Sequence, residues 1–144
     1  MMKLVNDSEL MEDIIITFPS GLIGFENQKE YSLCEVPGQS QFCRLFSKDK
    51  ELTLLLLNPF AVFPDYDITI TDEDRAELSL TEPENAFVLN TVTIPADDAE
   101  QITINLAAPI IINIKNRIGR QVILLGDYPV KQPLVAQRKR ACCG

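Results

Sequence analysis

The amino-acid sequence predicts an all-β protein, with a compact single-domain β-barrel-like fold of short strands and one short helix. Three observations support this prediction. Short apolar segments recur along the chain, turns containing Pro, Gly or Asn separate them, and several segments alternate apolar and polar residues with a period of two. A chain of 144 residues is long enough to bury one core. Closing the sheet on itself would also avoid exposed edges of isoleucine-rich strand.

In the first half of the chain, each expected strand ends at a turn signal. The leucine run at 52–57 is more apolar than a one-sided sheet needs, which favours a central strand covered on both faces. The sequence Gly21-Leu22-Ile23-Gly24 lacks the spacing of a phosphate-binding loop and predicts a turn. The strands expected here are residues 14–18, 31–35, 42–46 and 52–57, followed by turns at 19–21, 36–38, 47–50 and 58–59.

One helix is expected near the middle of the chain, after a short strand at 67–70. Thr71 offers an N-cap hydroxyl, and the carboxylates of Asp72, Glu73 and Asp74 would lie in the first turn, where the helix macrodipole favours negative charge. The helix should continue to Leu78 and be over before Pro83. The remaining expected strands are residues 86–94, 102–106, 110–114 and 121–125.

We expect residues 1–135 to form the single domain and residues 136–144 to form a loosely ordered basic tail. No segment approaches the ~20 apolar residues of a membrane-spanning helix, and the N-terminus does not resemble a signal peptide. These features predict a cytoplasmic protein without membrane contact.

The chain contains no histidine, which removes the usual general base, the commonest metal ligand and the usual activator of a serine or cysteine nucleophile. The cysteine spacing does not fit a zinc site. Cys34 and Cys43 are expected as small core residues in strands, and Cys142 and Cys143 as exposed thiols. We therefore predict that the protein is not an enzyme and binds no metal or cofactor.

Negative charge is concentrated in the middle of the chain. The formal net charge is −8, and residues 65–100 carry 11 acidic side chains against Arg75 alone. Residues 101–144 carry seven basic side chains against Asp127 alone. The acidic segment would repel nucleic acid and suits a basic protein partner, although charge runs often serve only solubility.

An aromatic loop at 58–66 precedes the acidic segment. Loops normally carry fewer large apolar groups, so the loop either folds back over the barrel or offers anchors for a partner. We expect Phe60 and Phe63 to cap the barrel and Tyr66 to contact a partner.

Four motifs, taken together and in order, resemble the FliW family of flagellar assembly factors across residues 3–135. The motifs are Phe18-Pro19-Ser20-Gly21-Leu22-Ile23-Gly24-Phe25, Asn58-Pro59 with Asp65-Tyr66, Asn105-Leu106-Ala107-Ala108-Pro109-Ile110-Ile111-Ile112-Asn113, and Gln121-Val122-Ile123-Leu124.

The resemblance implies a cytosolic bacterial protein of β-barrel-like fold without enzymatic activity. Members of this family bind newly made flagellin and also CsrA, a small dimeric RNA-binding repressor of translation. When flagellin is exported, the freed factor captures CsrA and relieves the repression of flagellin translation. Synthesis is thereby coupled to secretion.

We expect the acidic segment to face CsrA, whose RNA-binding function requires basic surface. The residues expected to bind CsrA are Asp65, Tyr66, Asp67, Asp72, Glu73, Asp74 and Glu77, with Tyr66 as the anchor and the acids as the charge. The flagellin-binding surface cannot be read from the motifs. One alternative is a nucleic-acid-binding β-barrel that uses the basic C-terminal segment, and another is an enzyme that relies on carboxylates alone.

Overall fold

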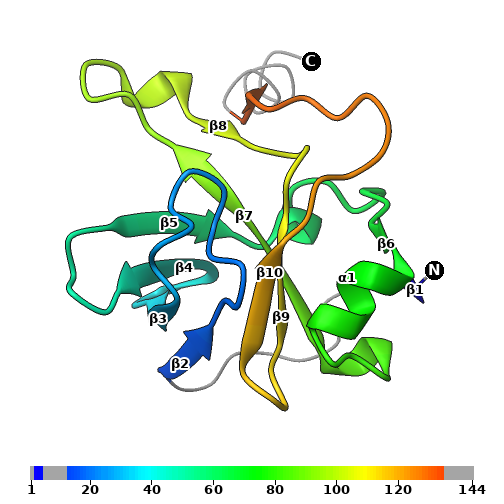
Figure 1. Ribbon diagram of the computed structural model, residues 1–144. Helices are drawn as coiled ribbons and strands as arrows, with labels where there is room; N and C mark the ends of the chain where they lie inside the picture. The colour runs from blue at the N-terminus through cyan, green and yellow to red at the C-terminus, as the bar shows by residue number, and fades with distance from the viewer. Residues whose placement is uncertain (1, 5–12, 135–144) are drawn as a thin grey trace.

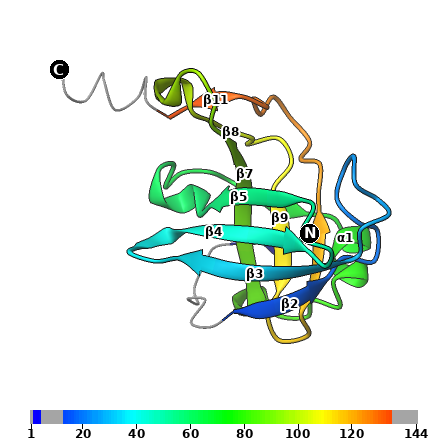
Figure 2. The same ribbon diagram turned by 90° about the vertical axis from the view of Figure 1, so that its left-hand side faces the viewer.

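Seven strands close into a barrel within the part of the chain that the computed structural model describes, residues 2–4 and 13–134 (Figures 1 and 2). Neighbouring strands are antiparallel, except that β10 runs parallel to β2. The predicted barrel-like fold is confirmed. In order around the barrel, the strands are β7 (Ala86–Thr93), β5 (Thr53–Leu57), β4 (Gln39–Ser47), β3 (Glu30–Val36), β2 (Ile14–Thr17), β10 (Ile118–Gln121) and β9 (Ile110–Asn113), which pairs again with β7.

Strand β7 also supports a short two-stranded extension of the sheet. Its first residues, 86–89, pair with β9, whereas Val92 and Thr93 pair with β8 (Thr103–Ile104), which in turn pairs with β11 (Gln132–Pro133). A turn separates β8 from β9, and the side chain of Asn105 accepts hydrogen bonds from the backbone N–H groups of Ala107 and Ala108 within it. The predicted strand at 102–106 is therefore shorter than expected.

The barrel interior is filled by alternate side chains of the strands. Tyr31 and Leu33 of β3, for example, are buried there, and the rings of Tyr31 and Phe18 form a T-shaped contact. Gly119 of β10 also faces this interior, since a Cβ atom built on it would lie 2.5 Å from the Phe18 ring. The buried residues of this interior cluster are Ile16, Phe18, Leu22, Tyr31, Leu33, Cys43, Leu45, Leu56, Phe87, Leu89, Ile110 and Ile112.

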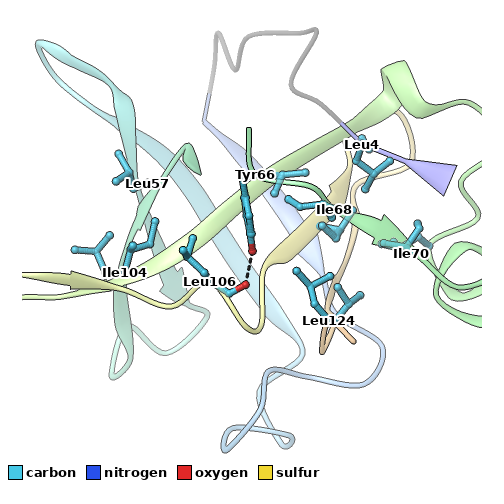
Figure 3. Packing of buried hydrophobic residues seen from close by; sticks show 14 of the residues in the cluster. Leu4, Leu57, Tyr66, Ile68, Ile70, Ile104, Leu106 and Leu124 are labelled. Carbon is cyan, nitrogen blue, oxygen red and sulfur yellow. Dashed lines mark hydrogen bonds between the residues drawn. The ribbon is translucent and has the colours of Figure 1, made fainter. Parts of the chain in front are cut away.

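A second layer covers the outer face of β7 and β9. It contains β1 (Met2–Lys3) paired with β6 (Thr69–Ile70), the helix α1 (Asp72–Glu77) and the 3-10 helix η1 (Pro59–Ala61). Figure 3 shows how Tyr66, Ile68, Ile70 and Leu124 pack together in this layer. Val88 and Ile111, which point away from the barrel interior, contribute to the same cluster. The strands β7 and β9 are therefore buried on both faces.

Several predictions are confirmed at the level of single residues. In β5, Leu56 packs in the barrel interior and Leu57 in the second layer, so this strand is covered on both faces. Cys43 is buried in the core as expected, whereas Cys34 in β3 is only partly buried and belongs to neither core cluster, so the prediction of a core residue is wrong for Cys34. Phe60 and Phe63 pack against the second layer, as expected for a loop that folds back.

Other predictions require correction or lie outside the described residues. The strand expected at 121–125 is shifted, since β10 ends at Gln121. Beyond it, Val122 and Leu124 donate backbone hydrogen bonds to Pro109 (3.0 Å) and Ala107 (2.9 Å) without forming a regular strand. The 3-10 helices η2 (Pro83–Asn85) and η3 (Ala99–Gln101) were not predicted. The tail at 136–144, with Cys142 and Cys143, lies outside the described residues.

Candidate functional site

Helix α1 holds the acidic residues in the way that the sequence predicts. Thr71 caps it, because its hydroxyl accepts a hydrogen bond from the Asp74 N–H (3.1 Å) and the Asp74 carboxylate accepts one from the Thr71 N–H (3.3 Å). The resulting capping box places Asp72 and Glu73 in the exposed first turn, where the macrodipole stabilises negative charge. Asp65 and Asp67 of the preceding segment are also exposed.

Arg120 of β10 neutralises the remaining two acids of this helix. Its Nε donates to Asp74 Oδ1 at 2.8 Å, and its Nη1 donates to Glu77 Oε2. The Ser20 hydroxyl also donates to Glu77, at 2.6 Å. These pairs join α1 to the barrel across a large sequence separation. Asp74 and Glu77, which we expected to supply charge to a partner, are thus engaged within the protein.

We expect Glu77→Gln to lower the free energy of unfolding by about 1 kcal/mol near neutral pH. Partial burial opposes ionisation, but hydrogen bonds from Ser20 and Arg120 together outweigh it and lower the pKa of Glu77. A carboxyl group whose pKa is lowered by folding stabilises the protein above its unfolded-state pKa, and this stability is lost as the pH falls through its folded-state pKa.

Urea unfolding followed by circular dichroism should therefore show a difference between wild type and Glu77→Gln that is constant near pH 7 and shrinks as the pH falls below the ordinary glutamate pKa of 4.5. Glu73→Gln, at an exposed residue of the same helix, is the matched control. A difference that persists unchanged at low pH would contradict the role of the ionised carboxylate.

Tyr66 is not a surface anchor, and this prediction is wrong. Its side chain is only 8% exposed and packs in the second layer, where its ring lies 5.8 Å from the ring of Tyr128. The Tyr66 hydroxyl donates to the Leu106 carbonyl (Figure 3) and accepts a hydrogen bond from Asn90 Nδ2 at 3.2 Å. Burial raises the pKa of Tyr66 to about 12. The residue ties the aromatic loop to the turn after β8.

Tyr66→Phe should lower the free energy of unfolding by about 1–3 kcal/mol, because it leaves the buried Leu106 carbonyl without its hydroxyl donor. Urea titration measures the change. Tyr128→Phe is the control, since the Tyr128 hydroxyl donates to the Asp67 carbonyl (3.0 Å) at a more exposed position. Equal effects of the two substitutions would argue against a special contribution from the buried hydroxyl.

An exposed apolar ridge lies next to the acidic segment, and the sequence did not reveal it. In the extended residues after β10, Val122 and Leu124 point into the second layer, whereas Ile123 and Leu125 are 71% and 82% exposed. We call Ile123 and Leu125 the apolar ridge. Between the ridge and the stretch at 67–71 lies a cavity of about 220 Å³, lined by Asp67, Thr69, Thr71, Asp74, Val122, Ile123, Leu124, Leu125 and Tyr128.

A larger groove of about 470 Å³ lies on the other side of Ile123. Its exposed apolar residues include Ile23, Phe25 and Val130, and none of the described residues that line it is charged. The turn at 21–25 that forms one wall depends on Gly21, whose φ is +68° and which would place a Cβ atom 2.6 Å from the Glu26 backbone. Large exposed apolar patches of this kind are typical of protein interaction sites.

The site offers no arrangement suited to a metal ion within the described part of the chain, where no group of three or more His, Cys, Asp or Glu side chains could hold one. Nor do the helices in that part include one that is long and apolar enough to cross a membrane. The two surface features that characterise the site are the cavity lined by Asp67 and Asp74 and the apolar groove, and Ile123 lines both of them.

Comparison with known proteins gives one consistent result. The family model described as FliW protein matches residues 2–134. A flagellar assembly factor FliW of Natranaerobius thermophilus is 43% identical over 128 residues, which cover 88% of this chain and 85% of that protein. One from Clostridium botulinum strain Alaska E43 is 40% identical, with 94% and 96% covered. A crystal structure of the flagellar assembly factor FliW aligns with a TM-score of 0.78 and 32% identity, covering 92% of this chain and 96% of the other.

Proposed function

The chain belongs to the FliW family of flagellar assembly factors, and we propose that it works by binding two proteins in turn, flagellin and the translational repressor CsrA. While flagellin occupies the factor, CsrA is free to repress flagellin translation. Export of flagellin releases the factor, which then captures CsrA and relieves the repression. The protein acts in the cytoplasm and couples flagellin synthesis to secretion by this exchange.

The observation that carries the CsrA half of the proposal is the exposed acidic surface of the 65–73 segment. Asp65, Asp67, Asp72 and Glu73 are all exposed, and Asp67 lines the cavity next to the apolar ridge. A protein that binds RNA must present basic surface, so this face is complementary to it. Charge complementarity raises the association rate and the selectivity, while the adjacent apolar ridge can supply buried contact area.

For flagellin we propose the uncharged groove lined by Ile23, Phe25 and Val130. The acidic face would bind a basic partner, whereas this groove suits apolar side chains of a chain that is still unfolded or unassembled. Ile123 lines both the groove and the acidic cavity. Occupation of one surface can therefore influence the other, which suits an exchange of partners.

The test is binding of the purified protein to purified CsrA and, separately, to purified flagellin. We expect co-elution with each partner in size-exclusion chromatography, with the CsrA complex weakened at high salt. Isothermal titration calorimetry should then show that saturation with flagellin lowers the affinity for CsrA. Binding to neither partner would overturn the proposal.

A direct RNA titration at moderate salt separates this proposal from the nucleic-acid-binding alternative. We expect no measurable binding, because the acidic face repels phosphate and Arg120 is already paired with Asp74 and Glu77. Tight, salt-sensitive RNA binding would favour the alternative.

A further inference from the structure

We propose that the 220 Å³ cavity beside the apolar ridge receives an arginine side chain of the partner, with the guanidinium against Asp67 and Asp74 and the methylenes against Ile123 and Leu125. This inference rests on the proposed function, since the arginine is taken to belong to CsrA. It adds a specific receptor site to what would otherwise be a general attraction between charged surfaces.

The two sides of the cavity differ in chemistry. One side is formed by Asp67, Thr69 and Thr71, the exposed polar residues of the 67–71 stretch. The opposite side is formed by Ile123 and Leu125, whose large exposure leaves both side chains available for contact. A guest that fits both sides needs an apolar stem and a positively charged end.

The base of the cavity is closed by groups that are already held in place. Val122 and Leu124 are 2% and 9% exposed, and their backbone N–H groups bond to Pro109 and Ala107. Tyr128 is fixed by the hydrogen bond from its hydroxyl to the Asp67 carbonyl at 3.0 Å. Because these groups do not have to be ordered on binding, a guest would lose little affinity to reorganisation of the site.

The orientation of the Asp74 carboxylate is also fixed before a guest arrives. The Thr71 N–H bonds to its Oδ2, and Arg120 Nε bonds to its Oδ1 at 2.8 Å. A carboxylate has about four acceptor positions, so further donors can still be accepted. Arg120 compensates part of the Asp74 charge.

Arginine fits this environment better than the other candidate side chains. Its methylene stem can cover apolar surface while its planar guanidinium bonds to carboxylates and stacks on aromatic rings such as Tyr128. A lysine ammonium is a strongly hydrated point charge that cannot make planar contacts of this kind. A wholly apolar guest would strip water from Asp67 without replacing its hydrogen bonds, which is unfavourable.

The experiment measures CsrA affinity by isothermal titration calorimetry for the wild type, Asp67→Asn and Leu125→Ser. We expect each substitution to weaken binding roughly 10-fold or more, because one removes the charge and the other the apolar wall. Ile15→Ser is the matched control, since Ile15 is 59% exposed on β2 and does not line the cavity. Its affinity should equal that of the wild type.

The guest is then identified by replacing each CsrA arginine with glutamine, alone and together with Asp67→Asn. One arginine should show a non-additive effect in the double-mutant cycle, because its contact is already lost in Asp67→Asn. If Asp67→Asn and Leu125→Ser bind CsrA as tightly as the wild type does, the cavity is not an arginine receptor. The same conclusion follows if only a lysine of CsrA couples to Asp67. In both cases the proposed function stands, because the wild type still binds CsrA. If the wild type does not bind CsrA, both the proposed function and this inference fail.

Discussion

Replacing Gly119 with valine is expected to destabilise the barrel by about 3 kcal/mol or more, which is at the upper end of the cost of overpacking a core. A Cβ atom at this position would lie 2.5 and 2.6 Å from two carbons of the Phe18 ring and 3.0 Å from Ile16 Cγ2. Phe18 and Ile16 are both fully buried in the barrel interior, so neither can move aside without disturbing its own neighbours. Urea unfolding followed by circular dichroism measures the loss.

Two further variants separate steric overlap from the general effect of losing a glycine. Gly38→Ala places its Cβ atom in open space but at a φ of +75°, so it should cost only about 1 kcal/mol from backbone strain. Phe18→Leu combined with Gly119→Val should recover part of the lost stability, because it removes the ring that the valine overlaps. Wild-type stability in Gly119→Val alone would show that the interior has room at this point.

Reversing two charges on α1, with Asp72→Lys and Glu73→Lys together, is expected to weaken CsrA binding by roughly 100-fold at low salt. Both side chains are exposed, so the double substitution replaces attraction with repulsion at the face proposed for CsrA. Asp74 is left intact because its carboxylate completes the capping box and pairs with Arg120. Including it would confuse a loss of binding with a loss of structure.

Calorimetry at several salt concentrations checks this prediction. The difference between variant and wild type should narrow as salt screens the interaction. Glu51→Lys with Asp97→Lys is the control, since it makes the same change of charge at exposed residues away from α1. Unchanged CsrA affinity in the α1 variant would exclude this helix from the interface. An equal loss of affinity in the control variant would show that the change in net charge, and not the position on α1, causes the weaker binding.

The sequence predicted those features that depend on neighbouring residues. The capping box of α1 joins Thr71 to Asp74, so its signal is complete within four residues. The packing of the 52–57 leucine run on both of its faces followed from its composition. The pairing of Arg120 with Asp74 joins residues 46 positions apart, and no local pattern contains it. For this reason the sequence led us to expect that Asp74 and Glu77, which pair with Arg120, would be available to a partner.

Tyr66 was misplaced although a usable signal was present. Tyr66, Ile68 and Ile70 alternate with the exposed residues Asp67 and Thr69, and this period of two places the tyrosine on the buried side. The apolar ridge carried no such signal. Residues 122–125 are all apolar, so the sequence does not distinguish the buried Val122 and Leu124 from the exposed Ile123 and Leu125.

The closure of the barrel has a consequence for the order in which a nascent chain can fold. Strands β2 to β7 are complete once Thr93 has been synthesised, but the seam is sealed only when Ile118 of β10 reaches Thr17 of β2 and β9 reaches β7. Such distant pairings are characteristic of slow folding. Until then, the free edges of β2 and β7 could pair with other chains. Truncation before residue 110 should accordingly yield an aggregating sheet.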